Sequence, residues 1–142
     1  MIKILKNSLI AISILGCASS ISMAHGDAET VKENFSRVIP NIPGKSLIAL
    51  EVDYAPGSAS PPHTHAKSSF IYAYVVSGTM ESKVDDEPAR LYKAGESWFE
   101  LPGAQHTISR NASDTEPAKL LAVFIVDTED TELVTPMETS KP

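Results

Sequence analysis

The sequence predicts an all-β fold, built as a barrel or a sandwich in a single domain. Short segments rich in β-branched and aromatic residues follow one another at close, regular spacing, with Gly or Pro between them. No segment has convincing helical periodicity. The length of 142 residues is that of a single domain. Six or more strands without a helix are typical of a barrel or a sandwich.

The first 24 residues are predicted to be a secretory signal peptide that lies outside the fold. Lys3 and Lys6 precede an apolar stretch over residues 9–16, and the segment ends in Ser-Met-Ala, which offers small residues to signal peptidase. The apolar stretch is well short of the roughly 20 residues that cross a bilayer, so we expect no transmembrane span. The mature chain is therefore expected to be exported to the periplasm.

A second interpretation applies to the same segment. Residues 14–17, Ile-Leu-Gly-Cys, resemble the lipobox of bacterial lipoproteins, in which the cysteine carries a lipid anchor. The protein would then be exported and held at a membrane through Cys17. Cys17 is the only cysteine, so no disulfide can form within the chain under either interpretation.

The charge balance is acidic. Residues 1–24 contain two lysines and no acid, and without them the chain has 10 Lys and Arg against 18 Asp and Glu. An acidic chain with no basic cluster is not expected to bind nucleic acid or anionic membrane surfaces. The expected partner is therefore a small molecule.

Three segments follow the signal peptide. Residues 25–45 are predicted to be an N-terminal lead-in, polar and containing two prolines, that forms either a helical turn or an extended segment. Residues 46–127 hold the barrel. Residues 128–142 form an acidic tail that is expected to be loosely ordered or to lie across a partner subunit.

Seven strands are expected within the barrel segment, separated by turns that contain Gly, Pro or Asp. The second strand is the most strand-like, and apolar residues on both of its faces suggest burial on both sides. The expected strands span residues 46–54, 70–76, 79–84, 90–92, 97–100, 105–109 and 120–126.

Two histidines lie shortly before the second strand. His63 and His65 follow a Pro-Pro pair, and they are separated by one residue. Because residues i and i+2 of an extended chain project from the same face, both imidazoles can reach one point in space. This is the arrangement that a metal site on a strand requires.

Glycines and histidines recur in two ordered groups. The first group comprises Gly57, His63, His65 and Gly78, and the second comprises Gly95, Gly103 and His106, with Pro102 and Asn111 each one position late. In this spacing the sequence resembles the two motifs of the cupins, small β-barrels with jelly-roll topology. The resemblance covers residues 47–126.

The resemblance implies that His106 joins His63 and His65 inside the barrel as a third metal ligand. The glutamate of the first motif would fall at Ser69, Phe70 or Ile71, and none of these is a carboxylate. Three neutral imidazoles favour one divalent transition metal (Fe, Mn, Zn, Ni or Cu) over Mg or Ca. Without a carboxylate the metal would keep its full charge and favour an anionic substrate. Such a site is similar to that of the thiol dioxygenases.

Three further residues are candidates for catalytic roles. Glu100 shares a strand face with Trp98, so it lies in the barrel if Trp98 does, and it is a candidate to replace the missing carboxylate. Tyr72 and Tyr74 share a face of the second strand and are candidates to handle protons or orient a substrate. Aromatic residues of this kind also form cores and dimer interfaces, so the structural role stays open for both.

With the signal peptide, the resemblance therefore implies an exported metal-binding cupin, acting as a small metal-dependent dioxygenase on a small organic molecule. The alternative is a non-catalytic periplasmic cupin that binds a small ligand or a metal, because one fold serves many functions. Cupin sheets often pair with a second subunit, which implies a homodimer.

Overall fold

The computed structural model describes residues 29–138, and this part of the chain is all β, as the sequence predicted. Within residues 29–138 there is no α-helix, and so none that could cross a membrane. The strands of this region are β1 (Thr30–Val38), β2 (Lys45–Tyr54), β3 (His63–His65), β4 (Phe70–Ser77), β5 (Thr79–Val84), β6 (Arg90–Lys93), β7 (Ser97–Glu100), β8 (Gln105–Asn111), β9 (Ala118–Asp127) and β10 (Val134–Pro136).

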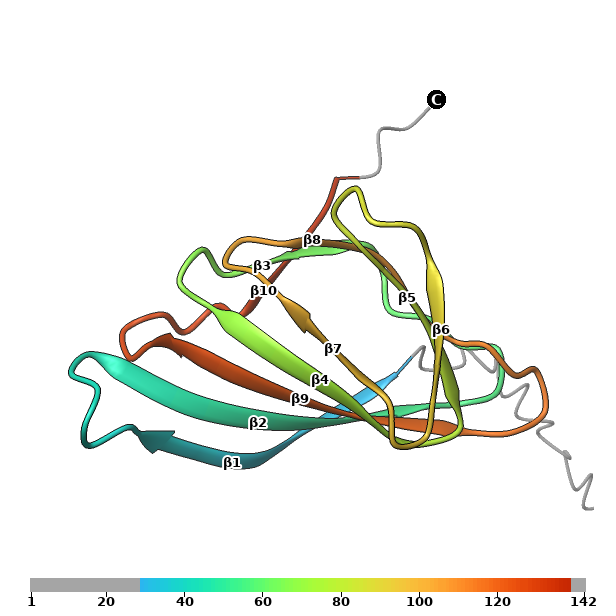
Figure 1. Cartoon of the computed structure of the whole chain (residues 1–142), viewed down its shortest axis with the longest axis horizontal. Helices are drawn as coiled ribbons and strands as arrows, with labels where there is room; N and C mark the ends of the chain where they lie inside the picture. The colour runs from blue at the N-terminus through green and yellow to red at the C-terminus, as the bar shows by residue number, and fades with distance from the viewer. Residues whose placement is uncertain (1–28, 139–142) are drawn as a thin grey trace, which may run out of the picture.

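The strands form two five-stranded antiparallel sheets. One sheet has the order β1-β2-β9-β4-β7 and the other the order β10-β3-β8-β5-β6. In Figure 1, β1, β2 and β9 form the lower layer, and β3, β8 and β5 lie above them. β9 lies between β2 and β4, so the first sheet combines strands from both ends of the described chain.

Both flanks of the expected barrel segment contribute a strand. β1 falls in the expected lead-in, residues 25–45, and pairs along its length with β2, so the extended alternative holds there and the helical turn does not. β10 falls in the expected tail, residues 128–142, and pairs with β3. These edge strands are held by backbone hydrogen bonds and have little apolar face, which is why their composition did not mark them.

Some of the sequence-based expectations lie outside the described residues. They are the signal peptide over residues 1–24, the lipid anchor at Cys17, and the ends of the expected lead-in and tail at residues 25–28 and 139–142.

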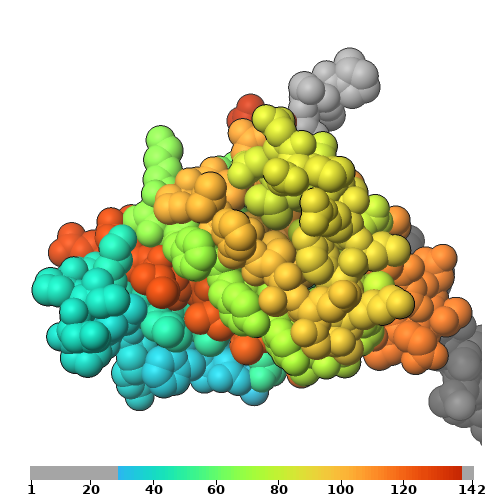
Figure 2. Space-filling model, viewed as in Figure 1, coloured from blue at the N-terminus to red at the C-terminus, as the bar shows by residue number. Residues whose placement is uncertain are grey.

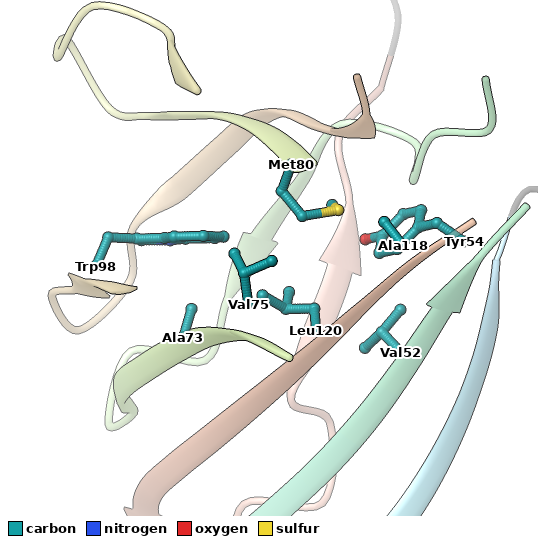
Figure 3. Packing of buried hydrophobic residues seen from close by; sticks show 8 residues of the cluster. All are labelled: Val52, Tyr54, Ala73, Val75, Met80, Trp98, Ala118 and Leu120. Carbon is teal, nitrogen blue, oxygen red and sulfur yellow. The ribbon is translucent and has the colours of Figure 1, made fainter. Parts of the chain in front are cut away.

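The core lies between the two sheets. Figure 3 shows Met80 of β5 and Trp98 of β7 pointing toward the side chains of β2, β4 and β9. β9 alternates strictly between more and less buried residues, as expected for a strand with one face on the core. A second cluster, formed by Ile71, Ala122 and Phe124, continues the core along the same sheet.

The outer face of β4 is exposed, which corrects the expectation that this strand is buried on both sides. Apolar side chains of β4 and β7 gather there in an outer apolar patch, where the rings of Phe70 and Phe99 stack with centroids 6.0 Å apart. The segments of β4, β6 and β7 lie together on the face that Figure 2 shows in green, yellow and amber. The outer apolar patch comprises Phe70, Tyr72, Val76, Phe99 and Leu101.

A tight turn at Gly78 joins β4 to β5. Gly78 has a φ of 77°, a backbone conformation that residues other than glycine rarely adopt. A Cβ placed there would lie 2.7 Å from the carbonyl oxygen of Pro117 and 2.8 Å from Cα of Ala118. The turn therefore packs directly on the start of β9, and glycine is required both by conformation and by space.

Candidate metal centre

Three histidines from two neighbouring strands meet inside the barrel. β3 supplies His63 and His65, and β8 supplies His106, which is the direct cross-strand partner of His63. The ring centroid of His63 lies 4.8 Å from that of His65 and 5.2 Å from that of His106. One ring nitrogen from each histidine lies within 4.8 Å of the others, so the three side chains could bind one metal ion.

Two of these imidazoles have partners that fix their orientation. His63 Nδ1 lies 2.8 Å from the carbonyl oxygen of Pro61, so it donates its proton there and leaves Nε2 free as an acceptor or ligand. His106 Nε2 lies 2.9 Å from the hydroxyl oxygen of Ser82 on β5. Such partners hold a ligating ring in place and set its tautomer. The sequence analysis did not identify Ser82, although alternation along β5 places it on the same face as the buried Met80.

Glu100 completes the cluster from β7. Its side chain is buried, with Oε2 lying 2.9 Å from His65 Nε2 and Oε1 lying 3.4 Å from His106 Nδ1. Trp98 Nε1 donates a hydrogen bond of 3.0 Å to Oε1. Glu100 and Trp98 thus lie on the same inner face of β7, as the alternation predicted. The site therefore has the carboxylate that the first motif lacks.

The polar atoms at the centre of this cluster lack the hydrogen bonds that burial normally requires. Neither ring nitrogen of His65 makes a hydrogen bond of good geometry within the described chain, and neither does Oε2 of Glu100. Buried polar atoms without partners are costly. A metal ion bound by these atoms would satisfy them, and two or three imidazoles with one carboxylate suit a transition metal. The donor set therefore fits a metal, whose identity it leaves open among Fe, Mn, Zn, Ni and Cu.

The protonation states also suit metal binding. Burial lowers the pKa of His106 to about 4 and also lowers the pKa of His63, so both rings are neutral near pH 7. For Glu100, burial raises the pKa, but the contact with His65 and the neighbouring His106 outweigh burial and hold the pKa below its ordinary value. Neutral imidazoles and an ionised carboxylate are the forms that ligate.

The two candidate tyrosines lie elsewhere. Tyr72 is 44% exposed on the outer face of β4, and Tyr74 is stacked beside it with ring centroids 6.5 Å apart. The neighbouring Ile71 and Ala73 point inward instead. This placement corrects the expectation that Tyr72 or Tyr74 handles protons at the site. Apolar residues on both faces of β4 gave no indication of which face is inside.

The metal-ligand candidates lie in the wall of a cavity of about 300 Å³ between the two sheets. Apolar side chains of β2, β4 and β9 form most of its lining, and a second polar group formed by Tyr54, Ser60, Ser109 and Glu29 also lines it. The sequence analysis missed this second group. Alternation would have placed Ser109, three residues beyond His106, on the opposite face of β8, and the bulge between them brings both to the cavity. Trp98 lies beside the cluster, with its ring centroid 6.3 Å from that of His106, while Phe99 is 62% exposed, so the two aromatic residues lie on opposite faces of β7.

A family model described as a cupin domain matches residues 50–124 of this chain. The chain belongs to the cupin family. This confirms the family resemblance and, with the two antiparallel sheets, the predicted single-domain jelly-roll barrel.

A longer plant protein is similar to part of this cupin. The chain is 31% identical over 90 residues to germin-like protein subfamily 2 member 2 of Arabidopsis thaliana, covering 61% of this chain and 40% of that protein. The chain thus spans about two fifths of the length of that relative.

Solved structures share the fold at low sequence identity. A recombinant oxalate oxidase in complex with glycolate has a TM-score of 0.58 and 22% identity, covering 80% of this chain and 57% of the other. The DMSP lyase DddQ of Ruegeria pomeroyi has a TM-score of 0.61 and 19% identity, covering 88% of this chain and 59% of the other.

Proposed function

We propose that this cupin is a metal-dependent oxidoreductase of the dioxygenase type that acts on a small organic molecule. The observation that carries the proposal is the convergence of His63, His65, His106 and Glu100 at the wall of an apolar cavity, with the nitrogens of His65 and Oε2 of Glu100 left without hydrogen bonds. The solved relatives named as an oxalate oxidase and a DMSP lyase support a small-molecule substrate.

The bound metal would supply Lewis acidity and open positions for substrate and O₂. The residues of the chain do the remaining work. Leu50, Ile71 and Phe124 line the cavity with apolar surface, which excludes water around a bound molecule. Glu100, held by Trp98, is the only carboxylate among the described residues that contacts the histidines, so it serves as a fourth ligand or as the proton acceptor there.

A dioxygenase reaction also matches what the cavity provides. Both atoms of O₂ enter the product, so the reaction needs no separate reductant and no second cofactor site. The carboxylate of Glu100 would offset part of the charge of a metal dication. An anionic substrate is therefore less favoured than it would be at a site of three histidines alone.

The alternative function is non-catalytic capture of a small ligand or of the metal itself. It is favoured by the outward position of Tyr72 and Tyr74, which leaves Glu100 as the one candidate proton-handling group near the histidines in the described chain. A binding protein needs no proton-handling group, whereas many enzymes use more than one such group in catalysis.

Oxygen uptake by metal-loaded protein distinguishes the two functions. The protein is loaded in turn with Fe, Mn, Zn, Ni and Cu and offered panels of thiols, diketones and phenolics in an oxygen-electrode assay. The proposal expects uptake with at least one redox-active metal, and its loss in His65→Ala. Tight binding of a panel member without oxygen uptake would instead establish the binding function.

Export and assembly belong to the same proposal. The signal peptide over residues 1–24 directs the protein to the periplasm, with a lipid anchor at Cys17 as the alternative. The acid excess supports a protein without a nucleic-acid partner. Release of a shorter, unmodified chain into a periplasmic fraction, measured by intact-mass spectrometry, would support the signal peptide and exclude the anchor.

The homodimer is proposed to form through the outer apolar patch, because β7 is an edge strand and its Phe99 is 62% exposed. Light scattering after size-exclusion chromatography tests this. Phe99→Lys should yield a monomer, whereas Val38→Lys on the opposite edge strand β1 should leave the dimer intact. A monomeric wild-type protein would refute the dimer.

A further inference from the structure

We propose that the polar group at the other side of the cavity is a hydrogen-bond-acceptor subsite, which selects substrates that carry a hydroxyl or amino group opposite their metal-binding end and rejects dicarboxylates. The inference rests on the proposed function, because it extends the same cavity. The subsite consists of Tyr54, Ser60, Ser109 and Glu29.

A directed chain of hydrogen bonds links these side chains. The Ser60 hydroxyl donates a hydrogen bond to Glu29 Oε2. Tyr54 OH lies 2.6 Å from Ser60 Oγ and 3.0 Å from Ser109 Oγ. A hydroxyl has one proton to donate. Since Ser60 gives its proton to Glu29, Tyr54 must donate to Ser60, and Ser109 must donate to Tyr54.

This direction leaves only acceptors for a ligand. Ser109 Oγ has used its proton on Tyr54 and keeps free lone pairs, and the carboxylate of Glu29 has no proton to give. Burial raises the pKa of Tyr54 to about 12, so its proton remains in the chain at any ordinary pH. A ligand group that donates an O–H or N–H bond fits this end, and a ligand carboxylate meets oxygen lone pairs without a proton.

The charge of the residues that line the cavity also disfavours a second carboxylate on the substrate. Among the residues that line it within the described chain there is no lysine or arginine, while Glu29 and Glu100 are both present. A second carboxylate on a substrate would therefore be desolvated without a cationic partner, which is strongly unfavourable. Only the metal can accept an anionic group.

The spacing sets the length of the substrate. Ser109 lies three residues beyond His106 on β8, and a bulge in β8 between them keeps the separation below the roughly 10 Å of three fully extended residues. Apolar side chains of β2, β4 and β9 lie between the two ends. A cavity of about 300 Å³ is at the small end of ligand pockets. A single ring with substituents at opposite ends matches this length, polarity and volume.

Three aromatic thiols test the subsite without any turnover. They are 4-methylbenzenethiol, 4-(hydroxymethyl)benzenethiol and 4-mercaptobenzoate, which share a metal-binding thiol and differ only at the far end. Their dissociation constants are measured anaerobically by calorimetry on full-length protein, both loaded with Zn²⁺ and metal-free. Zn²⁺ is redox-inert, so binding is measured apart from activity.

The inference expects the hydroxymethyl probe to bind about tenfold tighter than the methyl probe, because one hydrogen bond to a charged or polarised acceptor contributes about that factor. The carboxylate probe should bind at least about tenfold more weakly than the methyl probe. Ser109→Ala and Glu29→Gln should each reduce these ratios. Glu33→Gln changes an exposed glutamate of β1 that lies outside the cavity, and it should leave the ratios unchanged.

Equal affinities for the methyl and hydroxymethyl probes would overturn the inference, and so would ratios that Ser109→Ala and Glu29→Gln both leave unchanged. Absence of binding of all three probes in both forms would also overturn it. Failure of the protein to bind Zn²⁺ would instead refute the proposed metal-dependent function, and the ratios in the metal-free protein would still decide the subsite.

Discussion

Ile71 on β4 and Glu100 on β7 are direct cross-strand partners, with both side chains directed into the barrel. Of the three positions at which the cupin motif would place its glutamate, only Ile71 lines the cavity, since Phe70 points outward and the Ser69 hydroxyl donates to the backbone of Ala66. The carboxylate is therefore supplied one strand away from its usual place, at the same level of the sheet.

If Glu100 replaces the usual ligand, its removal should weaken metal binding. Glu100→Gln keeps the shape of the side chain and its bond with Trp98 but removes the charge, and we expect metal affinity to fall about 10–100-fold. Competition against a chelator measures the affinity. The matched control is Glu87→Gln, an exposed glutamate paired only with Arg90. Equal affinities for Glu100→Gln and wild type would show that the carboxylate takes no part in metal binding.

The hydroxyl of Ser82 should act through His106. Ser82→Ala removes the partner of His106 Nε2 without adding bulk, so the ring loses its fixed orientation and metal affinity should fall about tenfold. Ser97→Ala, at an exposed position of β7, is the control. An unchanged affinity in Ser82→Ala, with both variants folding normally by circular dichroism, would contradict this role.

Acid should destabilise the metal-free protein in a defined range. His106 has a pKa of about 4 in the folded protein against 6.5 in the unfolded chain, so its contribution to stability is complete above pH 6.5 and is lost as the pH falls toward 4. Glu100, whose pKa is also lowered, adds a loss in the same direction below about pH 4.5. The side chains of His63 and His65 lie next to both His106 and Glu100.

Urea unfolding between pH 7 and pH 4.5 measures this loss. The midpoint should fall steadily with acid in wild type and less steeply in His106→Gln, which has no proton to take up. Saturating metal should move the fall to lower pH, because it holds the imidazoles neutral. Parallel curves for wild type and His106→Gln would rule out His106 as the responsible group.

The turn at Gly78 should tolerate no side chain. Gly78→Ala combines an unfavourable φ with contacts under 3 Å to Pro117 and Ala118, and should cost about 2–5 kcal/mol of the free energy of unfolding. Gly95→Ala is the matched control, because Gly95 has a φ of 91° but nothing within 4 Å of the added Cβ. It should cost about 1–2 kcal/mol. Similar costs for both variants in urea titrations would contradict the packing at Gly78.

Local sequence patterns were sufficient to predict most strands of the barrel segment and to identify the three histidines. Residues 79–84 and 97–100 form β5 and β7 with the predicted bounds, because alternation and turn residues act within a few positions. His63, His65 and His106 were identified by spacing, which a shared ancestry preserves. These are features that a single strand or motif specifies by itself.

Features that depend on pairing between distant strands were harder to predict. The contact of Glu100 with the histidines depends on the register of β7 against β4, and the inner face of β4 depends on what packs against it. Tyr72 and Tyr74 were assigned to the site for this reason, because apolar residues on both faces leave the inward direction undetermined. β1 and β10 pair through backbone groups, which composition does not reveal.

The pairing of β3 with β10 has a consequence for how the protein is made. β3 is only three residues long. The edge strand β10 pairs with it, so that Val134 lies opposite His65 and Pro136 lies opposite His63. A nascent chain that has emerged only as far as β9 already contains all four side chains of the proposed metal centre. It still lacks β10, the outer partner of the strand that carries His63 and His65, so the metal centre gains its full backbone support only when the last strand has emerged.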